Sequence, residues 1–93
     1  MVIGVLEVSL LVPECNSLKD KRHVIKSILD GIRNKFNISA AETGELDAWR
    51  RSEIGFACVS NDKKVANTLL NHVLSGIESD PRVSVTDVQI EFL

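Results

Sequence analysis

The chain has 93 residues and a net charge of −2, and 26% of its residues are charged and 44% hydrophobic. These fractions are ordinary for a globular protein and argue against disorder. The length predicts a single domain over residues 1–93, and the near-neutral charge gives no bulk argument for a nucleic-acid or anionic-membrane partner.

Residues 2–12 are rich in Val, Leu and Ile and are followed by Pro13, which predicts a β-strand. Its apolar residues alternate between two faces, Leu6, Val8, Leu10 and Val12 on one and Ile3, Val5 and Leu11 on the other. A strand apolar on both faces is usually central in its sheet. The run has no basic leader and is too short to span a bilayer, so we expect a cytoplasmic protein without a membrane segment.

Residues 17–36 form the clearest predicted helix, because their apolar residues recur at helical spacing. Ser17 is the expected N-cap, with Asp20 in the position of a capping-box acid. The segment holds six of the eleven basic residues, and four of them share one face: Lys19, Arg22, Lys26 and Arg33. Lys21 instead projects near the apolar face, so its ammonium must reach solvent or meet a partner.

Two features of this helix are unfavourable for its own stability. Lys19, Lys21 and Arg22 lie in the first turns, where the helix dipole disfavours cations. Gly31 lies in the helix interior, which suggests a close approach to another backbone. The cations form either a solvated face or a surface directed at an anion or a partner, and the pattern leaves both interpretations open.

Residues 37–44 predict a short edge strand, and residues 45–52 a polar connection that carries the only Trp. Trp49, beside Arg50 and Arg51, would either stack on a base or a partner chain or simply cover the sheet edge. Residues 53–60 are nearly unbroken apolar and predict a second central strand.

Residues 60–62 supply capping oxygens for a second helix that runs to about residue 78, and residues 82–93 predict the last strand. The alternation of that strand slips near Thr86 and Asp87, which indicates a β-bulge. His72 is interpreted as structural. Cys15 and Cys58 fit no metal-ligand spacing and are expected to be reduced thiols, so neither a metal nor a cofactor is predicted.

The order strand, helix, strand, strand, helix, strand predicts an α+β, ferredoxin-like βαββαβ sandwich. Its four-stranded antiparallel sheet would have both helices on one face, leaving the other face open. Because that open face keeps apolar residues, we expect a homodimer through it, with pairing of edge strands as the alternative.

Three segments resemble the YlxP-like family of small bacterial proteins: SLKDKRHVIKSILDGIRNKFNIS, LDAWRRSEIGFACVSND and DVQIEFL. The most specific parts are SLKDKR and the pattern W-x-R-x-E-x-G, here Trp49, Arg51, Glu53 and Gly55. The resemblance covers essentially the whole chain. It implies a ferredoxin-like fold, no established enzymatic activity, and genes that often lie beside those of translation initiation and ribosome maturation factors.

The leading functional hypothesis is a non-enzymatic binding protein that contacts rRNA phosphates, a ribosomal subunit or a protein partner. The candidate contacts are the stacking or interface residue Trp49 and the basic residues Lys19, Lys21, Arg22, Lys26, Arg33, Arg50 and Arg51. One alternative is a homodimeric or small-ligand-sensing module. Another is a small acylphosphatase-like enzyme with Cys15 as an activated nucleophile near a helix N-terminus.

Overall fold

The computed structural model describes all residues 1–93 and has the element order that the sequence predicts. The strands are β1 (Val2–Leu11), β2 (Ser39–Gly44), β3 (Arg51–Ser60) and β4 (Ser84–Phe92), and the helices are α1 (Leu18–Lys35) and α2 (Lys63–Glu78). The sheet is antiparallel with the order β2-β3-β1-β4, so the two most apolar strands are central. The predicted ferredoxin-like βαββαβ fold is confirmed.

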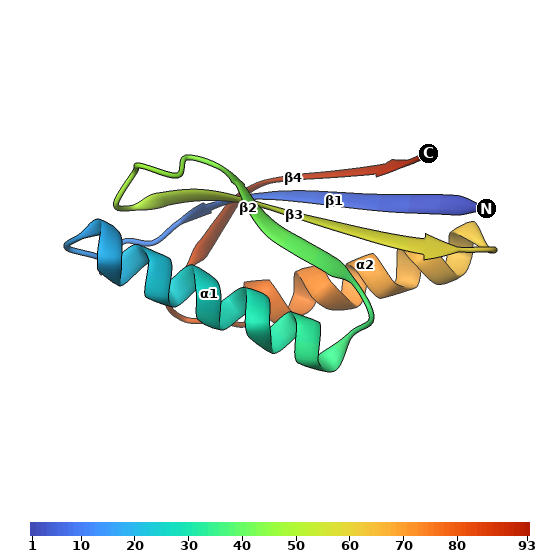
Figure 1. Cartoon of the computed structure of the whole chain (residues 1–93), viewed down its shortest axis with the longest axis horizontal. Helices are drawn as coiled ribbons and strands as arrows, with labels where there is room; N and C mark the ends of the chain where they lie inside the picture. The colour runs from blue at the N-terminus through green and yellow to red at the C-terminus, as the bar shows by residue number, and fades with distance from the viewer.

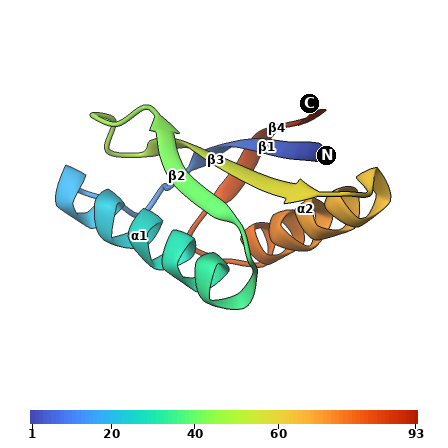
Figure 2. The ribbon, with the colours of Figure 1, turned by 45° about the vertical axis from the view of Figure 1, so that its right-hand side comes forward.

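Both helices lie on one face of the sheet and leave the other face open (Figures 1 and 2). The register gives the physical reason, because Leu6, Val8 and Leu10 lie opposite Phe56, Ile54 and Ser52 and all six point toward the helices. Their neighbours along β1 point to the open face. The core formed on the helix side contains seventeen buried apolar residues, including Ile25 and Ile32 of α1 and Leu70 and Val73 of α2.

Two local features that the sequence predicts are present, the N-cap of α1 and the bulge in β4. The Ser17 hydroxyl accepts a hydrogen bond from the Asp20 N–H at 3.0 Å, which confirms the N-cap of α1. The Asp20 carboxylate accepts from the Asn16 N–H, one residue before the position that a regular capping box uses. The bulge in β4 is also confirmed, because the register against β1 shifts between Ser9 and Leu10 and leaves Thr86 unpaired.

The expectation that Gly31 marks a close backbone approach is wrong. A Cβ built on Gly31 would meet no atom within 4 Å, because this position of α1 faces open space. The glycines at which a side chain would be crowded lie in the sheet: a Cβ on Gly55 of β3 would lie 2.9 Å from the Thr43 Cγ2 atom, and one on Gly4 of β1 would lie 3.1 Å from the Leu70 Cδ1 atom. None of the helices is long and apolar enough to cross a membrane.

Candidate functional site

The most distinctive polar group in the molecule is Lys21, whose side chain is completely buried. Its position on α1 points into the space between the helix and β2, where it meets Glu42 from the helix-facing side of that strand. The ammonium donates to the Glu42 carboxylate at 2.9 Å, and the Ser52 hydroxyl donates to the same oxygen at 2.6 Å. Lys21 therefore has the partner that its sequence position required.

The remaining bonds of Lys21 go to main-chain oxygens. The ammonium lies 2.7 Å from the carbonyl oxygen of Glu45, 3.2 Å from that of Arg51 and 3.4 Å from that of Leu46. These carbonyls belong to residues 45–50, which we call the anchored loop, and to the first residue of β3. A bend at Glu45, which has a φ of 57°, turns the carbonyls toward the lysine.

A second attachment holds the other end of the anchored loop. The Arg50 guanidinium donates from Nε to the Cys15 carbonyl at 3.0 Å and lies 3.4 Å from the Asn16 side-chain oxygen. The Arg50 carbonyl accepts from the Val12 N–H at 2.8 Å. The anchored loop is thus tied to the end of β1, to the start of α1 and to the interior of the molecule.

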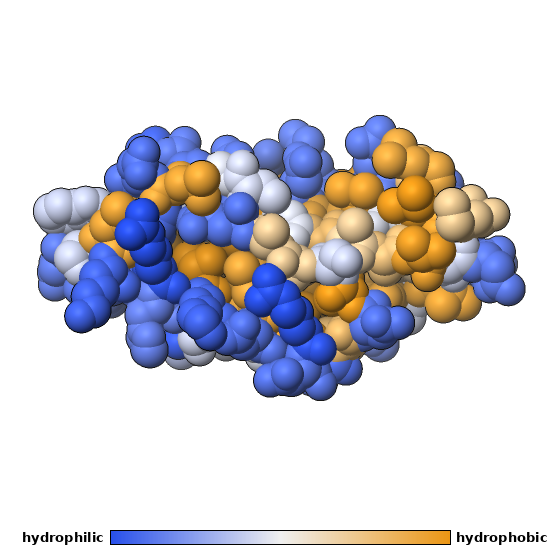
Figure 3. Space-filling model, viewed as in Figure 1, coloured by the Kyte–Doolittle hydropathy of each residue, from blue (hydrophilic) through white to orange (hydrophobic).

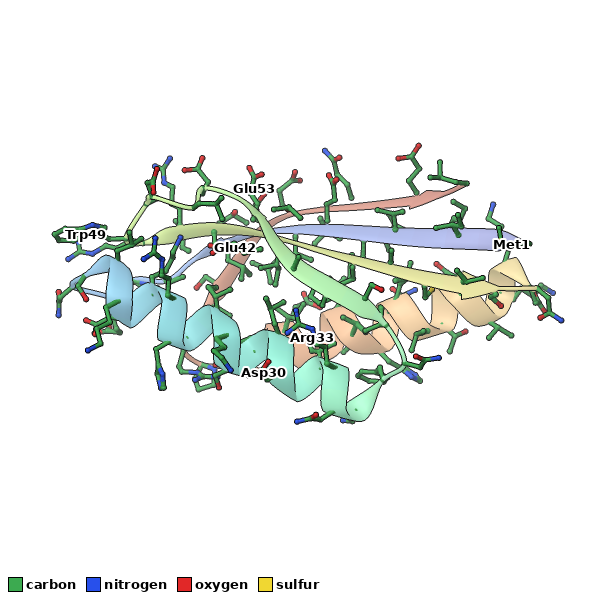
Figure 4. All side chains as sticks on the ribbon, viewed as in Figure 1. Met1, Asp30, Arg33, Glu42, Trp49 and Glu53 are labelled. Carbon is green, nitrogen blue, oxygen red and sulfur yellow. The ribbon has the colours of Figure 1, made fainter.

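Trp49 stands on the anchored loop at one extreme of the molecule, opposite the end that carries Met1 (Figure 4). Its side chain is 55% exposed and its indole N–H makes no hydrogen bond within the chain. Leu46 in the same loop is 53% exposed. If Trp49 covers the sheet edge, it does so with less than half of its surface, and the larger part is exposed to solvent.

The structure separates the seven basic residues that the sequence placed in one group. The prediction that Lys21 contacts phosphate is wrong, because the side chain is fully buried and is bonded to Glu42 and to the anchored loop. Arg51 lies opposite Leu11 in the register and so belongs to the open face. Arg33 is occupied by the Asp30 carboxylate and the Ala40 carbonyl (Figure 4).

Three exposed cations remain together on α1, and we call Lys19, Arg22 and Lys26 the basic arc. Lys26 is paired with Asp30 at 2.6 Å, and this hydrogen bond is the main cause that lowers the pKa of the Asp30 carboxyl. Lys19 and Arg22 have no carboxylate within 4.0 Å. They are consequently free to bind an external anion.

The open face differs from the expectation in its charge. The register confirms Ile3, Val5 and Leu11 on this face, but it also places four carboxylates there. These are Glu7, Glu53, Asp87 and Glu91, and none of them is paired with a cation. We call the part of the open face that carries these four acids the acidic half. The sequence did not predict it, because the acids come from three strands and become neighbours only in the sheet.

The exposed apolar residues gather mainly at the end of the molecule that carries both chain termini (Figure 3). They include Val59, which is 69% exposed, together with Met1, Val65 and Leu93. Toward the opposite end, the surface over α1 is largely hydrophilic (Figure 3). The molecule therefore has an apolar end and an end where the anchored loop lies over the start of α1.

Cys15 does not have the properties of an activated nucleophile. Its side chain is buried, and burial is the main cause that raises the pKa of the thiol, with the Asp20 charge acting in the same direction. An activated cysteine requires the opposite shift. Cys15 and Cys58 are both free thiols, and no cluster of His, Cys, Asp and Glu has a geometry that could hold a metal.

Comparisons with known protein sequences match nearly the whole chain. A family model described as protein of unknown function (DUF503) matches residues 3–90. The uncharacterized protein YlxP of Bacillus subtilis is 37% identical over 91 residues, which is 98% of this chain and 99% of YlxP.

Two designed proteins are similar in structure. LFR1 1, a designed ferredoxin fold, has a TM-score of 0.63 and 15% identity, covering 98% of this chain and 86% of its own. Foldit4 has a TM-score of 0.56 and 16% identity, covering 100% of this chain and 97% of its own. At these identities the likeness concerns the fold alone.

Proposed function

The chain belongs to the family described as protein of unknown function (DUF503), and from its surface chemistry we propose that it is a non-enzymatic, ribosome-associated RNA-binding protein. The observation that carries the proposal is the basic arc, since Lys19 and Arg22 are exposed on one face of α1 and neither has a carboxylate within 4.0 Å. Exposed cations at helical spacing are suited to successive phosphates of an RNA backbone.

The distribution of acids defines the side from which RNA approaches. RNA-recognition domains built on a four-stranded sheet usually bind through aromatic residues on the open sheet face. Here that face has Glu7, Glu53, Asp87 and Glu91, which repel phosphate. RNA therefore binds on the helix side, and the contacts of the basic arc go to the backbone and carry no sequence information by themselves.

The connection to the ribosome has a different basis. The gene neighbourhood implied by the resemblance to YlxP-like proteins, beside translation initiation and ribosome maturation factors, supports rRNA or a ribosomal subunit as the source of the RNA. The physical observations support an anionic backbone of any origin. The experiment must therefore test both ribosomal particles and isolated RNA.

We expect the purified protein to co-sediment with ribosomal particles at low salt and to dissociate as salt rises. Two phosphate contacts, from Lys19 and Arg22, predict a log–log salt slope of about 1.4 on single-stranded RNA. The double variant Lys19→Glu/Arg22→Glu should abolish binding. Lys63→Glu/Lys64→Glu is the matched control, because it changes the net charge equally at the exposed start of α2.

Two results would contradict the proposal. Equal losses in both double variants would show that only net charge matters and that the basic arc is not the binding surface. Binding that does not respond to salt would show that phosphate contacts do not carry the affinity. Circular dichroism of each variant verifies that it remains folded.

A second candidate function, a homodimeric interaction module, is supported by the apolar end. Val59 and Ile3 are neighbours in the register of the open face, and Val59 is 69% exposed. We propose that a second copy would pack at this end, away from the acidic half. Light scattering should then show a dimer that Val59→Asp converts to a monomer, and a monomeric wild-type chain at high concentration would exclude it.

A further inference from the structure

We propose that the anchored loop presents Trp49 as a stacking surface for an unpaired base, so that the RNA bound by the basic arc is single-stranded or looped. This inference rests on the proposed function and specifies the class of RNA. It depends on three observations, which are the buried lysine under the loop, the exposure of the indole, and the attachment of the loop to the start of α1.

The buried lysine fixes the shape of the anchored loop. Taking an ammonium out of water is unfavourable unless its protons all find acceptors. Half of its four acceptors come from the loop itself, namely the carbonyls of Glu45 and Leu46. A surface loop is usually among the most mobile parts of a protein, but this one is bonded to the interior. Trp49 is therefore held in place before any ligand arrives.

The indole is the exposed part of this ordered segment. Trp49 has 55% of its surface exposed and its N–H has no partner, so the fold does not use the side chain fully. A large flat ring on a preordered loop loses little conformational entropy when it stacks on a ligand. Aromatic side chains that bind single strands without sequence preference have this character.

The position of the loop connects the indole to the cations. Arg50, next to Trp49, binds the Cys15 carbonyl two residues before the Ser17 N-cap. Trp49 consequently lies at the end of the molecule where α1 begins and where the basic arc starts at Lys19 (Figure 4). A strand with phosphates on the arc can place a base on the indole.

One acid of the anchored loop and one acid of β3 restrict the path of the strand. Glu45 lines a depression with Arg51 and Glu53 toward the open face, where the carboxylates disfavour phosphate. The strand therefore approaches from α1. The faces of the bases are hidden within an A-form duplex, so only unpaired nucleotides satisfy the indole and the arc together.

Trp49 is the only Trp and the chain has no Tyr, so intrinsic fluorescence reports on this side chain alone. We expect an oligouridine to quench the fluorescence on binding at low salt, whereas a duplex RNA of equal length binds without quenching. The affinities of variants follow from the anisotropy of end-labelled RNA. Trp49→Ala should weaken oligouridine binding about tenfold. It should leave duplex binding unchanged, and Trp49→Phe should retain part of the affinity.

Lys21→Met tests the role of the lysine as a positioning residue. If the variant folds, it should lose most of the quenching and the preference for oligouridine but keep duplex binding through the basic arc. Val65→Ala, which shortens another exposed apolar side chain at the far end of the molecule, serves as the control and should change nothing. If Lys21→Met fails to fold, Trp49→Ala still decides the matter.

The outcomes separate the two proposals. Oligouridine binding that needs Lys19 and Arg22 but neither quenches Trp49 nor weakens in Trp49→Ala would overturn the stacking inference and leave the proposed function standing. If the protein bound neither oligouridine nor duplex RNA, both the stacking inference and the proposed function would be overturned. Loss of ribosome binding in Trp49→Ala without any change in RNA affinity would also overturn the inference and indicate a protein contact.

Discussion

Replacing Lys21 by Ala should destabilise the protein more than replacing any other basic residue. The side chain is completely buried and donates to the Glu42 carboxylate and to three carbonyl oxygens. Removing one partner of a fully buried ion pair costs about 3–5 kcal/mol, because the other charge stays desolvated. The lower end of this range applies to Lys21→Ala, because the Glu42 side chain is 15% exposed. Domains of this size are stable by about 5–15 kcal/mol, so Lys21→Ala should remove a large fraction of the free energy of unfolding.

Urea unfolding monitored by circular dichroism measures this free energy. The dependence on urea, the m-value, should be unchanged in a variant that affects only stability. Lys19→Ala is the matched control, since Lys19 lies on the same helix but is exposed. We expect it to change the free energy of unfolding by less than about 0.5 kcal/mol.

A double variant distinguishes the ion pair from the loop contacts. In Lys21→Met/Glu42→Leu both charges are absent, and a buried ion pair replaced by apolar residues is often neutral in stability. The Leu46 and Arg51 carbonyls would still lose their lysine donor, at about 1–3 kcal/mol for each one left buried and unpaired. The double variant should therefore recover only part of the loss. A single-variant loss below about 1 kcal/mol, or full recovery in the double variant, would refute this reasoning.

Gly31→Ala should raise the free energy of unfolding by about 0.5–1 kcal/mol, because the new methyl meets open space and Ala favours a helix; lower stability in urea would show a hidden contact. The Arg82 hydrogen bond is the main cause that lowers the pKa of the Asp80 carboxyl below its ordinary value of 3.8. Because the pKa of Asp80 is lower in the folded than in the unfolded state, this stabilisation is complete above the unfolded pKa and is lost as pH falls through the folded pKa. Asp80→Asn should therefore lower the free energy of unfolding at pH 7 and make that free energy decline less steeply in acid. Cys15, buried with a raised thiol pKa, should react with iodoacetamide at pH 7 more slowly than free cysteine and react fully only in urea; fast labelling of the folded protein would contradict this.

Much of the fold was predictable because the evidence for it is local. The alternation in β1, the helical spacing in α1 and the slip near Thr86 are each properties of a few consecutive residues. The two most apolar strands had to be central because burial on both faces requires it. The placement of both helices on one face followed from the order of the elements.

The candidate site was less predictable because it joins residues far apart in the chain. The helical spacing showed that Lys21 needs a partner, but Glu42 and the carbonyl of Arg51 were beyond any periodic pattern. The helical spacing separated Lys21 from the cationic face, but the candidate contacts still included it with cations that the structure leaves exposed. It could not show that Arg51 lies on the opposite side of the sheet, since that depends on the pairing of β3 with β1.

Sequence alone thus determined the elements, their order and the face that each apolar residue buries, because period and composition act within a strand or a helix. Only the tertiary structure decided which charges are available. Burial commits Lys21 to the anchored loop, strand register collects Glu7, Glu53 and Asp87 on the open face, and loop geometry leaves Trp49 exposed beside the start of α1. Solvation and charge pairing depend on neighbours in space, and the fold sets those neighbours.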